Sequence, residues 1–507
     1  MKSLADLEDP PDSCEHARSP SNAPLLSWKY ADKLSTSIPT PRSLPLNTRF
    51  RRLVVLAVAA LFAFAVIALS SSHLSSFDHA TSELTSPSTT LAAAPLVDIS
   101  DVDLQGQYTY SPYVNGPPTA RFRDNLRNDT KYITSWISAG WTNDVMTYAN
   151  LIYLGSITDR VPIIAMFTPS HIGGDAETIR FGDVFDVQRF NKESGIHIIE
   201  WDEVKARNST EVEDIGCWNI WEAVQYNEDH PRGSAIPWHV GLDISYTRAP
   251  DWVKLIPDYP HDQGSSFWAL ARLGFPQERA KHLGTATPSP QHGVTLDPDQ
   301  QVLCYDYLYY TWAQQPYEWE NDYFPAWRFV TKYLRWTKGI EALTALYLRR
   351  AFDLTTTAEI PPYIAIHVRH GDFRNWCWAA EQPEDCFAPL PVIARRVREV
   401  QDELRRRKGI EIPATRVVMT SDEKDQLWWD EVLALGWQRI DHDALHTAQT
   451  YGRWYPVLLD AAIQSNALGF VGTDRSTYSV LSRRRVEDWQ DGATRMVLWG
   501  TKGADDH

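Results

Sequence analysis

Strand-like and helix-like segments alternate from Pro362 to the C-terminus, and this alternation most constrains what the chain can fold into. Short apolar runs rich in β-branched residues are separated by longer segments with helical periodicity. Parallel strands need such crossover helices, so the pattern predicts a doubly wound parallel sheet. The expected strands are 363–369, 415–420, 437–440 and 468–472, and the expected helices are 390–407, 425–435, 454–466 and one that begins near 476.

A second α/β unit precedes this one. Residues 215–320 are dense in aromatic residues and prolines and show no clear pattern, whereas 326–352 is typical of one long helix or two abutting helices. The sequence thus predicts the α/β class, with two Rossmann-like doubly wound lobes and a cleft between them. The other expected elements are strands at 132–138, 161–167 and 196–201, and a helix after the turn at 139–143 that Thr142 or Asn143 caps.

The first 104 residues contain one candidate membrane segment. Residues 1–52 are rich in Pro and Ser, which predicts a disordered tail. An apolar run of about 17 residues follows at 53–70, behind an arginine-rich stretch, and predicts a transmembrane anchor with a cytosolic N-terminus. We therefore expect a single-pass type II protein of the Golgi or ER, with a flexible stem at 71–104 and a lumenal remainder. Two Asn-x-Ser/Thr triplets agree with a lumenal glycoprotein.

Composition narrows the class of partners. The 507 residues carry a net charge of −16, which argues against nucleic acid as a partner.

Four of the five cysteines fall on the predicted lumenal side and allow two disulfides in three possible pairings. Proximity favours Cys377 with Cys386, and hence Cys217 with Cys304. No CxxC pair is present in the sequence, so we expect no structural zinc site.

A polar cluster ends the strand expected at 363–369. It contains Arg369, His370 and Asp372, with His367 just before them. In open α/β sheets, ligands bind at the carboxyl ends of the strands. A guanidinium there suits a phosphate, because it offers a planar fork of donors to anionic oxygens. Arg369 is therefore the candidate anion contact, and the other three residues are expected to shape and orient it.

Two further clusters end strands of the same predicted sheet. Ser476, Thr477 and Tyr478 open a helix, where free N–H groups and the helix dipole favour an anion. Ser421 and Asp422 follow the middle strand, where a carboxylate could accept from a purine amino group or a ribose hydroxyl. Taken singly, each cluster is also compatible with plain helix capping. Together they predict one site for a nucleotide diphosphate, because the carboxyl ends of parallel strands share one edge.

These clusters resemble motifs of the GDP-fucose protein O-fucosyltransferases and related fucosyltransferases. His367-Val368-Arg369-His370-Gly371-Asp372-Phe373 is similar to the donor-lobe motif of that family. Phe470-Val471-Gly472 with Ser476-Thr477-Tyr478 is similar to a second motif, and Asp460 matches an Asp that the family places upstream of it. Gly140-Trp141-Thr142-Asn143 looks like the acceptor-lobe motif, a Gly-rich turn that opens a long helix.

The resemblance implies a two-lobe GT-B fold, with an acceptor-side lobe at 105–353 and a GDP-sugar-binding lobe at 354–507. It implies inverting, metal-independent transfer of fucose from GDP-fucose to a protein or glycan acceptor, without a further cofactor. The type that the resemblance implies is a peptide O-fucosyltransferase. Arg369 would stabilise the leaving GDP, since developing charge needs a preorganised cation. The residues implied in substrate binding are Gly140, Asn143, His367, Asp372, Ser421, Asp422, Asp460, Ser476, Thr477 and Tyr478.

Position 139 departs from the family pattern. Some relatives place a Glu just before the acceptor-lobe glycine as general base, and this chain has Ala139 there. Asp144 is the remaining candidate, because a base needs a carboxylate within hydrogen-bond reach of the acceptor hydroxyl. Two alternatives stay open: a catalytically inactive nucleotide-sugar- or glycan-binding protein on the same fold, and a polysaccharide fucosyltransferase.

Overall fold

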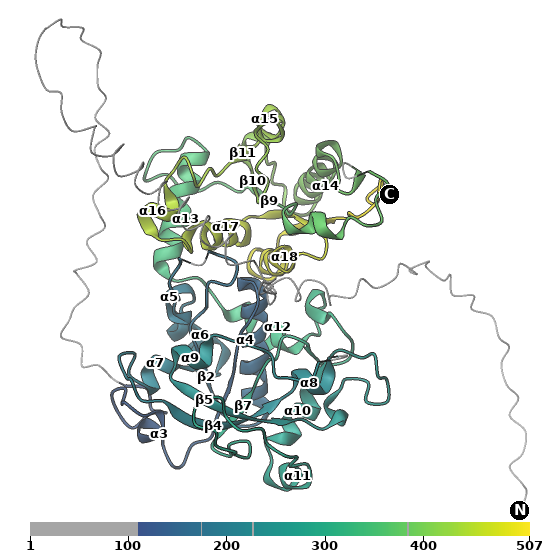
Figure 1. Cartoon of the computed structure of the whole chain (residues 1–507). Helices are drawn as coiled ribbons and strands as arrows, with labels where there is room; N and C mark the ends of the chain where they lie inside the picture. Colours follow the sequence, from purple (N-terminus) through teal and green to yellow (C-terminus); the bar gives the residue numbers. More distant parts are fainter. Residues whose placement is uncertain (1–109, 174, 226–227, 383–384, 507) are drawn as a thin grey trace, which may run out of the picture. The chain divides into compact units, whose positions relative to one another are not determined.

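Two parallel β-sheets organise the chain (Figure 1). The structure is a computed structural model that describes residues 110–173, 175–225, 228–382 and 385–506. These residues belong to one compact unit. The α/β class with parallel sheets, expected from the sequence, is confirmed.

The first sheet has six strands, all paired in parallel. They are β1 (Tyr132–Ser135), β2 (Val161–Ile164), β3 (Ile199–Glu200), β4 (Glu213–Asn219), β5 (Leu242–Arg248) and β7 (Val302–Tyr305). Their order is β3-β2-β1-β7-β4-β5. The long helix α4 (Trp141–Ile157) packs against β1 and β2.

The second sheet has five parallel strands in the order β11-β10-β9-β12-β13. They are β9 (Ile364–Val368), β10 (Val417–Ser421), β11 (Gln438–Arg439), β12 (Gly469–Thr473) and β13 (Ala493–Val497). Side chains of β9 enter two different cores: Ile364 and Ile366 lie in one, and Ala365 lies in the other. Both faces of this sheet are therefore buried, which explains the unbroken apolar runs in its sequence.

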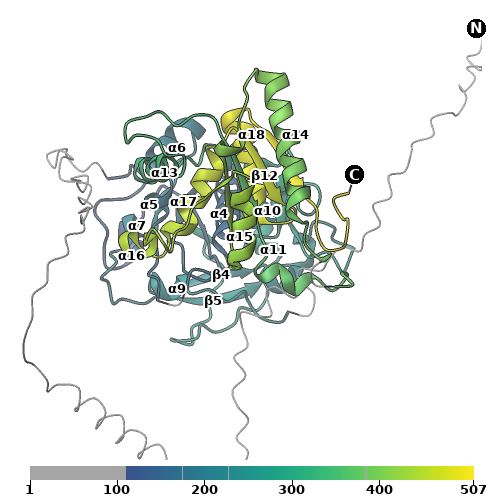
Figure 2. The same cartoon turned by 90° about the horizontal axis from the view of Figure 1, so that it is seen from above.

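Helices cover both faces of the second sheet. α14 (Leu390–Lys408) supplies one core, and α17 (Tyr455–Ser465) and α18 (Thr477–Gln490) supply the other. α13 (Lys338–Ala351) packs beside α17, and α17 packs beside α18 (Figure 2). The other helices are α3 (Phe122–Asn125), α5 (Phe181–Val184), α6 (Val187–Ser194), α7 (Trp201–Val204), α8 (Trp221–Val224), α9 (Ile236–His239), α10 (Phe267–Leu273), α11 (Pro276–Lys281), α12 (Pro325–Phe329), α15 (Gln426–Ala434) and α16 (Thr447–Tyr451).

Two helices of the second sheet also belong to the core of the first. Leu458 and Ala462 of α17 and Leu481 of α18 are buried in the large cluster that surrounds the first sheet. Leu459 and Ile463 of α17 point instead into the core of the second sheet. This pair of helices is therefore apolar on two sides, because each side is covered by a different sheet.

The region 215–320, which the sequence left unassigned, supplies three strands of the first sheet. Cys217 and Trp218 on β4 and Tyr305 on β7 are completely buried. Both disulfides favoured by the sequence are confirmed: Cys217–Cys304 joins β4 to β7, and Cys377–Cys386 closes a short loop. Core packing thus explains these buried aromatic residues, whereas Trp238 and Trp268 of the same region are exposed.

Two predicted helix boundaries are wrong. The stretch 326–352 is interrupted after α12 by a 3-10 turn at Thr331–Tyr333, and α13 begins only after Thr337, whose side chain caps it. The cap of α4 is Gly140, so Thr142 and Asn143 lie in its first turn. Their side chains therefore do not cap α4 and instead contact Thr477 at the beginning of α18.

No helix in the described part of the chain is long and apolar enough to cross a membrane. The tail at 1–52, the anchor at 53–70 and the stem at 71–104 lie outside the described residues. These three expectations, and the border between lobes at 353 and 354, stay predictions.

Candidate functional site

Arg369 lies directly after β9, at the carboxyl edge of the second sheet. Its backbone N–H donates to the Thr473 hydroxyl (3.0 Å), which donates in turn to the carbonyl of His367 (3.1 Å). A hydroxyl at the end of β12 thus fixes the end of β9. The guanidinium contacts two carboxylates: Nε donates to Asp372 Oδ1 (2.8 Å), and Nη1 lies 2.9 Å from Asp422 Oδ2.

Asp422 links Arg369 to the backbone of the loop that follows β9. Its Oδ1 accepts the backbone N–H of His370 (2.8 Å), while Oδ2 faces Arg369. A Cβ at Gly371 would lie only 2.2 Å from Oδ2, so glycine is required for this close approach. The loop and the carboxylate together fix the direction of the guanidinium, which remains partly exposed at 32%.

His370 and Glu423 form a partly buried pair beside the arginine. His370 Nδ1 lies 2.8 Å from Glu423 Oε2, and Arg374 Nη2 donates to the same oxygen (2.7 Å). Burial raises the pKa of Glu423, but N–H groups of Asp425 and Lys424, the His370 ring and the Arg374 charge outweigh it and lower the pKa to about 2. Glu423 is therefore an ionised anchor for the loop. Ser421, predicted to bind substrate, accepts the backbone N–H of Glu423 (3.0 Å).

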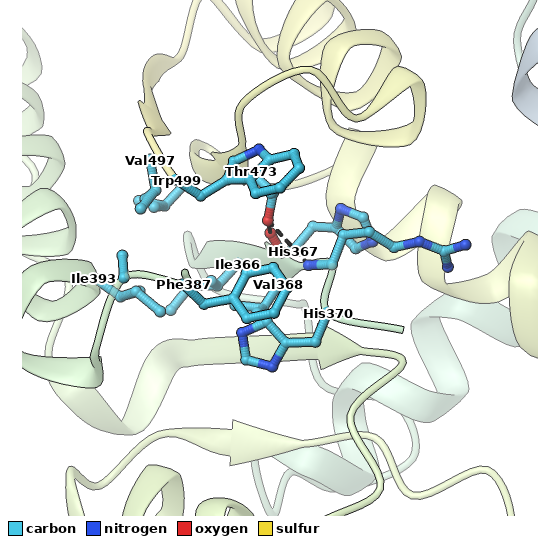
Figure 3. A pocket seen from close by; sticks show the side chains of 12 residues that line it. Ile366, His367, Val368, His370, Phe387, Ile393, Thr473, Val497 and Trp499 are labelled. Atoms are coloured by element: carbon cyan, nitrogen blue, oxygen red, sulfur yellow. Dashed lines mark hydrogen bonds between the residues drawn. The ribbon is translucent and has the colours of Figure 1, made fainter. Parts of the chain in front are cut away.

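A pocket opens between the ends of β9, β12 and β13 (Figure 3). Phe387 lies over the ring of His370, with 4.4 Å between the ring centroids. Trp499 stacks on Phe387 at 5.8 Å. The pocket therefore combines flat aromatic walls with a polar rim, and its cavity volume is about 20 Å³, which is room for about one water molecule. Its lining residues are Ile366, His367, Val368, Arg369, His370, Phe387, Ala388, Ile393, Val471, Thr473, Val497 and Trp499.

His367 is a neutral member of the site. Ser479 Oγ accepts the backbone N–H of Thr473 (3.0 Å) and lies 2.7 Å from His367 Nδ1, so the serine proton is available to the imidazole. Burial, with a contribution from Arg369, lowers the pKa of His367 to about 3. The ring therefore stays uncharged at neutral pH and packs 4.8 Å from the Tyr478 ring.

The N-terminus of α18 faces the N-terminus of α4. Ser476 caps α18 by accepting the backbone N–H of Ser479. Thr477 Oγ1 donates to Asn143 Oδ1 (2.7 Å) and lies 2.8 Å from Thr142 Oγ1. An amide oxygen can only accept, so the Thr477 hydroxyl donates its proton to Asn143. The Thr142 hydroxyl therefore donates to the oxygen of Thr477. The positive ends of two helix dipoles thus meet at these hydroxyls, an environment that favours an anion.

Tyr478 and Asp460 lie on the inner side of the same edge. The Tyr478 hydroxyl donates to the carbonyl of Val457 (2.5 Å). Asp460 on α17 accepts from His442 Nε2 (2.9 Å). Burial lowers the pKa of His442, but the charge and hydrogen bond of Asp460 outweigh it and raise that pKa. Asp460 is thus engaged with His442.

Asp144 occupies a buried position and not an open one. It is 0% exposed, and its Oδ1 accepts the backbone N–H of Ala139 (3.0 Å). Burial raises the pKa of Asp144 well above its ordinary value, although N–H groups of Ala139 and Ser138 and the charge of Arg232 oppose this. A base has to touch the acceptor hydroxyl. This placement favours a structural role for Asp144, which holds the turn before α4. Gly140 lies in that turn, beside His171.

Arg485 was not singled out in the sequence, and the structure gives it an unusual setting. It is 1% exposed, and its Nε and Nη2 have no hydrogen-bond partner among the described residues. Its guanidinium lies over Trp336 (4.6 Å), Trp489 (5.5 Å) and Phe185 (5.9 Å). Burial lowers the pKa of Arg485 to about 9. An arginine within the run 483–485 is typical of a solvated helix face, so the sequence carried no signal for this cage.

One group of described residues could hold a metal ion. Potential ligand atoms of Asp214, Asp243 and His292 lie within 4.8 Å of one another. Asp214 and Asp243 stand at the amino ends of β4 and β5, at the opposite edge from the carboxyl ends. Asp243 accepts the backbone N–H groups of Gln291 and His292, so it anchors the loop that ends at the first sheet.

Neither a protein-family model nor a curated protein matches the sequence. Among solved structures, this chain is similar to POFUT1 in complex with GDP-fucose (15% identity, TM-score 0.46, 74% of this chain and 99% of that chain). It is also similar to NodZ alpha-1,6-fucosyltransferase soaked with GDP-fucose (14%, TM-score 0.32, 71% and 93%). A third similar structure is the fucosyltransferase NodZ from Bradyrhizobium (12%, TM-score 0.35, 70% and 93%).

Proposed function

We propose that this chain transfers fucose from GDP-fucose to a hydroxyl group of a protein or glycan acceptor. The reaction inverts the anomeric centre, needs no metal and takes place on a GT-B fold. Arg369 stabilises the leaving GDP, and the enzyme is anchored by residues 53–70 with its catalytic part in the lumen of the Golgi or ER.

The position of Arg369 carries this proposal. Its guanidinium lies at the carboxyl edge of a parallel sheet, oriented by Asp372 and Asp422 beside an aromatic pocket. The N-terminus of α18, next along the same edge, offers further N–H donors to a diphosphate. A fixed cation and helix amides aimed at one place can stabilise the charge that develops as GDP departs. The motif around 367–373 points to the same chemistry.

The acceptor side supports the assignment less specifically. The burial of Asp144 leaves the general base unassigned, and it favours one alternative function, a nucleotide-sugar-binding protein without turnover. In either case the donor site is the same. We therefore separate donor binding from transfer in the test.

A donor screen by nucleotide release tests the proposal. The purified protein is incubated with GDP-fucose, GDP-mannose and UDP-sugars, with and without EDTA, and with a panel of glycoprotein acceptors. We expect release of GDP from GDP-fucose only, with an unchanged rate in EDTA. A requirement for a divalent metal, or release from another donor, would contradict the assignment. Tight binding of GDP in calorimetry with no turnover on any acceptor would favour the binding-protein alternative.

A further inference from the structure

We propose that the Cys377–Cys386 disulfide positions the aromatic wall of the nucleotide pocket. The disulfide joins two segments that each supply a part of the site. Its role is to keep the site in shape for nucleotide binding, and it has little part in the global stability of the fold. The identity of the ligand, GDP, rests on the proposed function; the positioning role itself is argued from the contacts below.

The first segment is the 3-10 turn η5 (Asp372–Trp376), which Cys377 ends. Asp372 accepts from Arg369 Nε, so the turn holds the guanidinium. The ring of Phe373 stacks on Trp499 at 4.7 Å, with 28° between the ring planes. A displacement of this turn would therefore change both the direction of Arg369 and one ring of the wall.

The second segment begins at Cys386, which is completely buried. The carbonyl of Cys386 accepts the backbone N–H of Gly500 (2.7 Å), next to Trp499. Phe387 follows directly and stacks between Trp499 (5.8 Å) and His370 (4.4 Å). The position of Cys386 therefore places the Phe387 ring at the pocket.

Four rings form a continuous stack between these two segments, in the order Phe373, Trp499, Phe387, His370. The Trp499 indole donates from Nε1 to the carbonyl of Asp474 (2.8 Å), in the turn before α18. The stack therefore reaches from the loop after β9 to the turn at the helix N-terminus. The spacing between the rings therefore depends on the positions of Cys377 and Cys386, the two ends of the disulfide loop.

The described residues between the two cysteines offer no comparable tether. Their backbone hydrogen bonds are local, from Ala380 to Cys377 and from Asp385 to Gln382. One salt bridge leaves the loop, from Lys502 to Asp385 (3.2 Å), and its lysine is 81% exposed. Exposed pairs of this kind contribute little, because solvent screens them. The covalent bond is consequently the main restraint that keeps the turn and Phe387 together.

The two disulfides differ in access, which allows a selective test. Cys377 is half-buried at the surface, whereas Cys217 and Cys304 are completely buried in the first sheet. A dithiol reductant attacks the accessible sulfur, the S–S bond breaks, and two thiols form as the reductant becomes a cyclic disulfide. Two electrons and two protons pass from the reductant to the protein. Under native conditions, Cys377–Cys386 should be reduced first.

The experiment uses the full chain, treated with dithiothreitol under native conditions and checked by alkylation and mass spectrometry. After selective reduction, we expect the Kd for GDP to rise by about tenfold or more, with recovery on reoxidation. The donor KM should rise and kcat should fall, because the released turn no longer orients Arg369. Hydrogen exchange at 369–376 should increase, because the turn is released.

A double variant, Cys377→Ser with Cys386→Ser, should reproduce the reduced protein, and Cys217→Ser with Cys304→Ser is the matched control. The control removes a disulfide between β4 and β7, so it should lower the unfolding temperature and leave the Kd for GDP unchanged. Unchanged GDP binding and unchanged exchange at 369–376 after selective reduction would overturn the inference. An oxidised protein that binds no GDP would overturn the proposed function, whereas the exchange measurement would still decide the positioning role.

Discussion

Arg369 and Asp422 form an ion pair across the ends of the neighbouring strands β9 and β10, with Nη1 2.9 Å from Oδ2. The carboxylate is fixed on its other side by the backbone N–H of His370. The guanidinium therefore has a defined direction before any ligand binds. Such preorganisation is what makes a cation effective at a centre of developing charge.

Removing this cation should abolish transfer and spare the fold. We expect Arg369→Ala to lower the rate of GDP release from GDP-fucose by about 10²–10³-fold, the usual effect of losing one such donor. The unfolding temperature should change little, because the side chain is partly exposed. Arg405→Ala on α14, an arginine that pairs with Asp402 on the same helix, is the control and should keep wild-type rates. Activity of Arg369→Ala within a few-fold of wild type would refute its role.

The buried carboxylate of Asp144 provides a test of the general base. Burial raises its pKa, and its observed partner is a backbone N–H group that an amide oxygen can also accept. We expect Asp144→Asn to keep donor turnover and acceptor transfer within a few-fold of wild type. A loss of about 10²-fold or more in transfer, with GDP binding unchanged, would instead identify Asp144 as the base.

The contact between the two helix N-termini depends on one hydroxyl. Thr477→Val removes the bonds to Asn143 and Thr142, and should lower the free energy of unfolding by about 1–3 kcal/mol, since both partners lose a bond. Thr477→Ser keeps the hydroxyl and should stay near wild type. Urea denaturation of the three proteins measures the difference. Equal stability of the Val and Ser variants would show that the contact contributes nothing.

His367 should make the fold sensitive to acid. Its pKa in the folded protein is about 3, below the ordinary value of 6.5, so the unfolded chain binds the proton more readily. The stabilising effect of the neutral ring is complete above pH 6.5 and is lost as the pH falls towards 3. The unfolding free energy should therefore decline over this range, and less steeply in His367→Asn. Parallel pH profiles for both proteins would contradict the assignment.

Arg485 should be replaceable by an apolar side chain of similar length. Burying a cation without hydrogen-bond partners is costly, and its contacts are with aromatic rings. We expect Arg485→Met to stay within about 1–2 kcal/mol of wild type. Arg485→Ala should lose about 3 kcal/mol or more, because it leaves a cavity between the rings. Denaturant titrations of both variants provide the comparison.

Four of the five strands of the second sheet could be predicted because their sequence pattern is local, whereas β13 was not expected. The strand at 363–369 ends in polar residues, and β9 indeed ends at Val368, just before Arg369. Ser476 was expected at the beginning of a helix, and it caps α18. Each of these signals depends on neighbours in the chain, so a short window of sequence contains it.

In the first sheet, β1, β2 and β3 lie within predicted strands, whereas β4, β5 and β7 could not be predicted. β4 and β7 are buried on both faces and contain bulky aromatic residues such as Trp218 and Tyr305, so no alternation of polar and apolar residues marks them. The burial of Asp144 and the cage around Arg485 depend on residues far away in the chain. Neither a carboxylate in a helix nor an arginine in a basic run reveals such surroundings.

Helices α17 and α18 contribute side chains to the cores of both sheets, so the two halves of the chain depend on each other for folding. Leu458 and Leu481 complete the core of the first sheet, although both follow the second sheet's first strand in the sequence. A polypeptide cut near residue 353 would expose this apolar surface on both fragments. The two halves should consequently melt in one cooperative transition, and neither should be soluble when expressed alone.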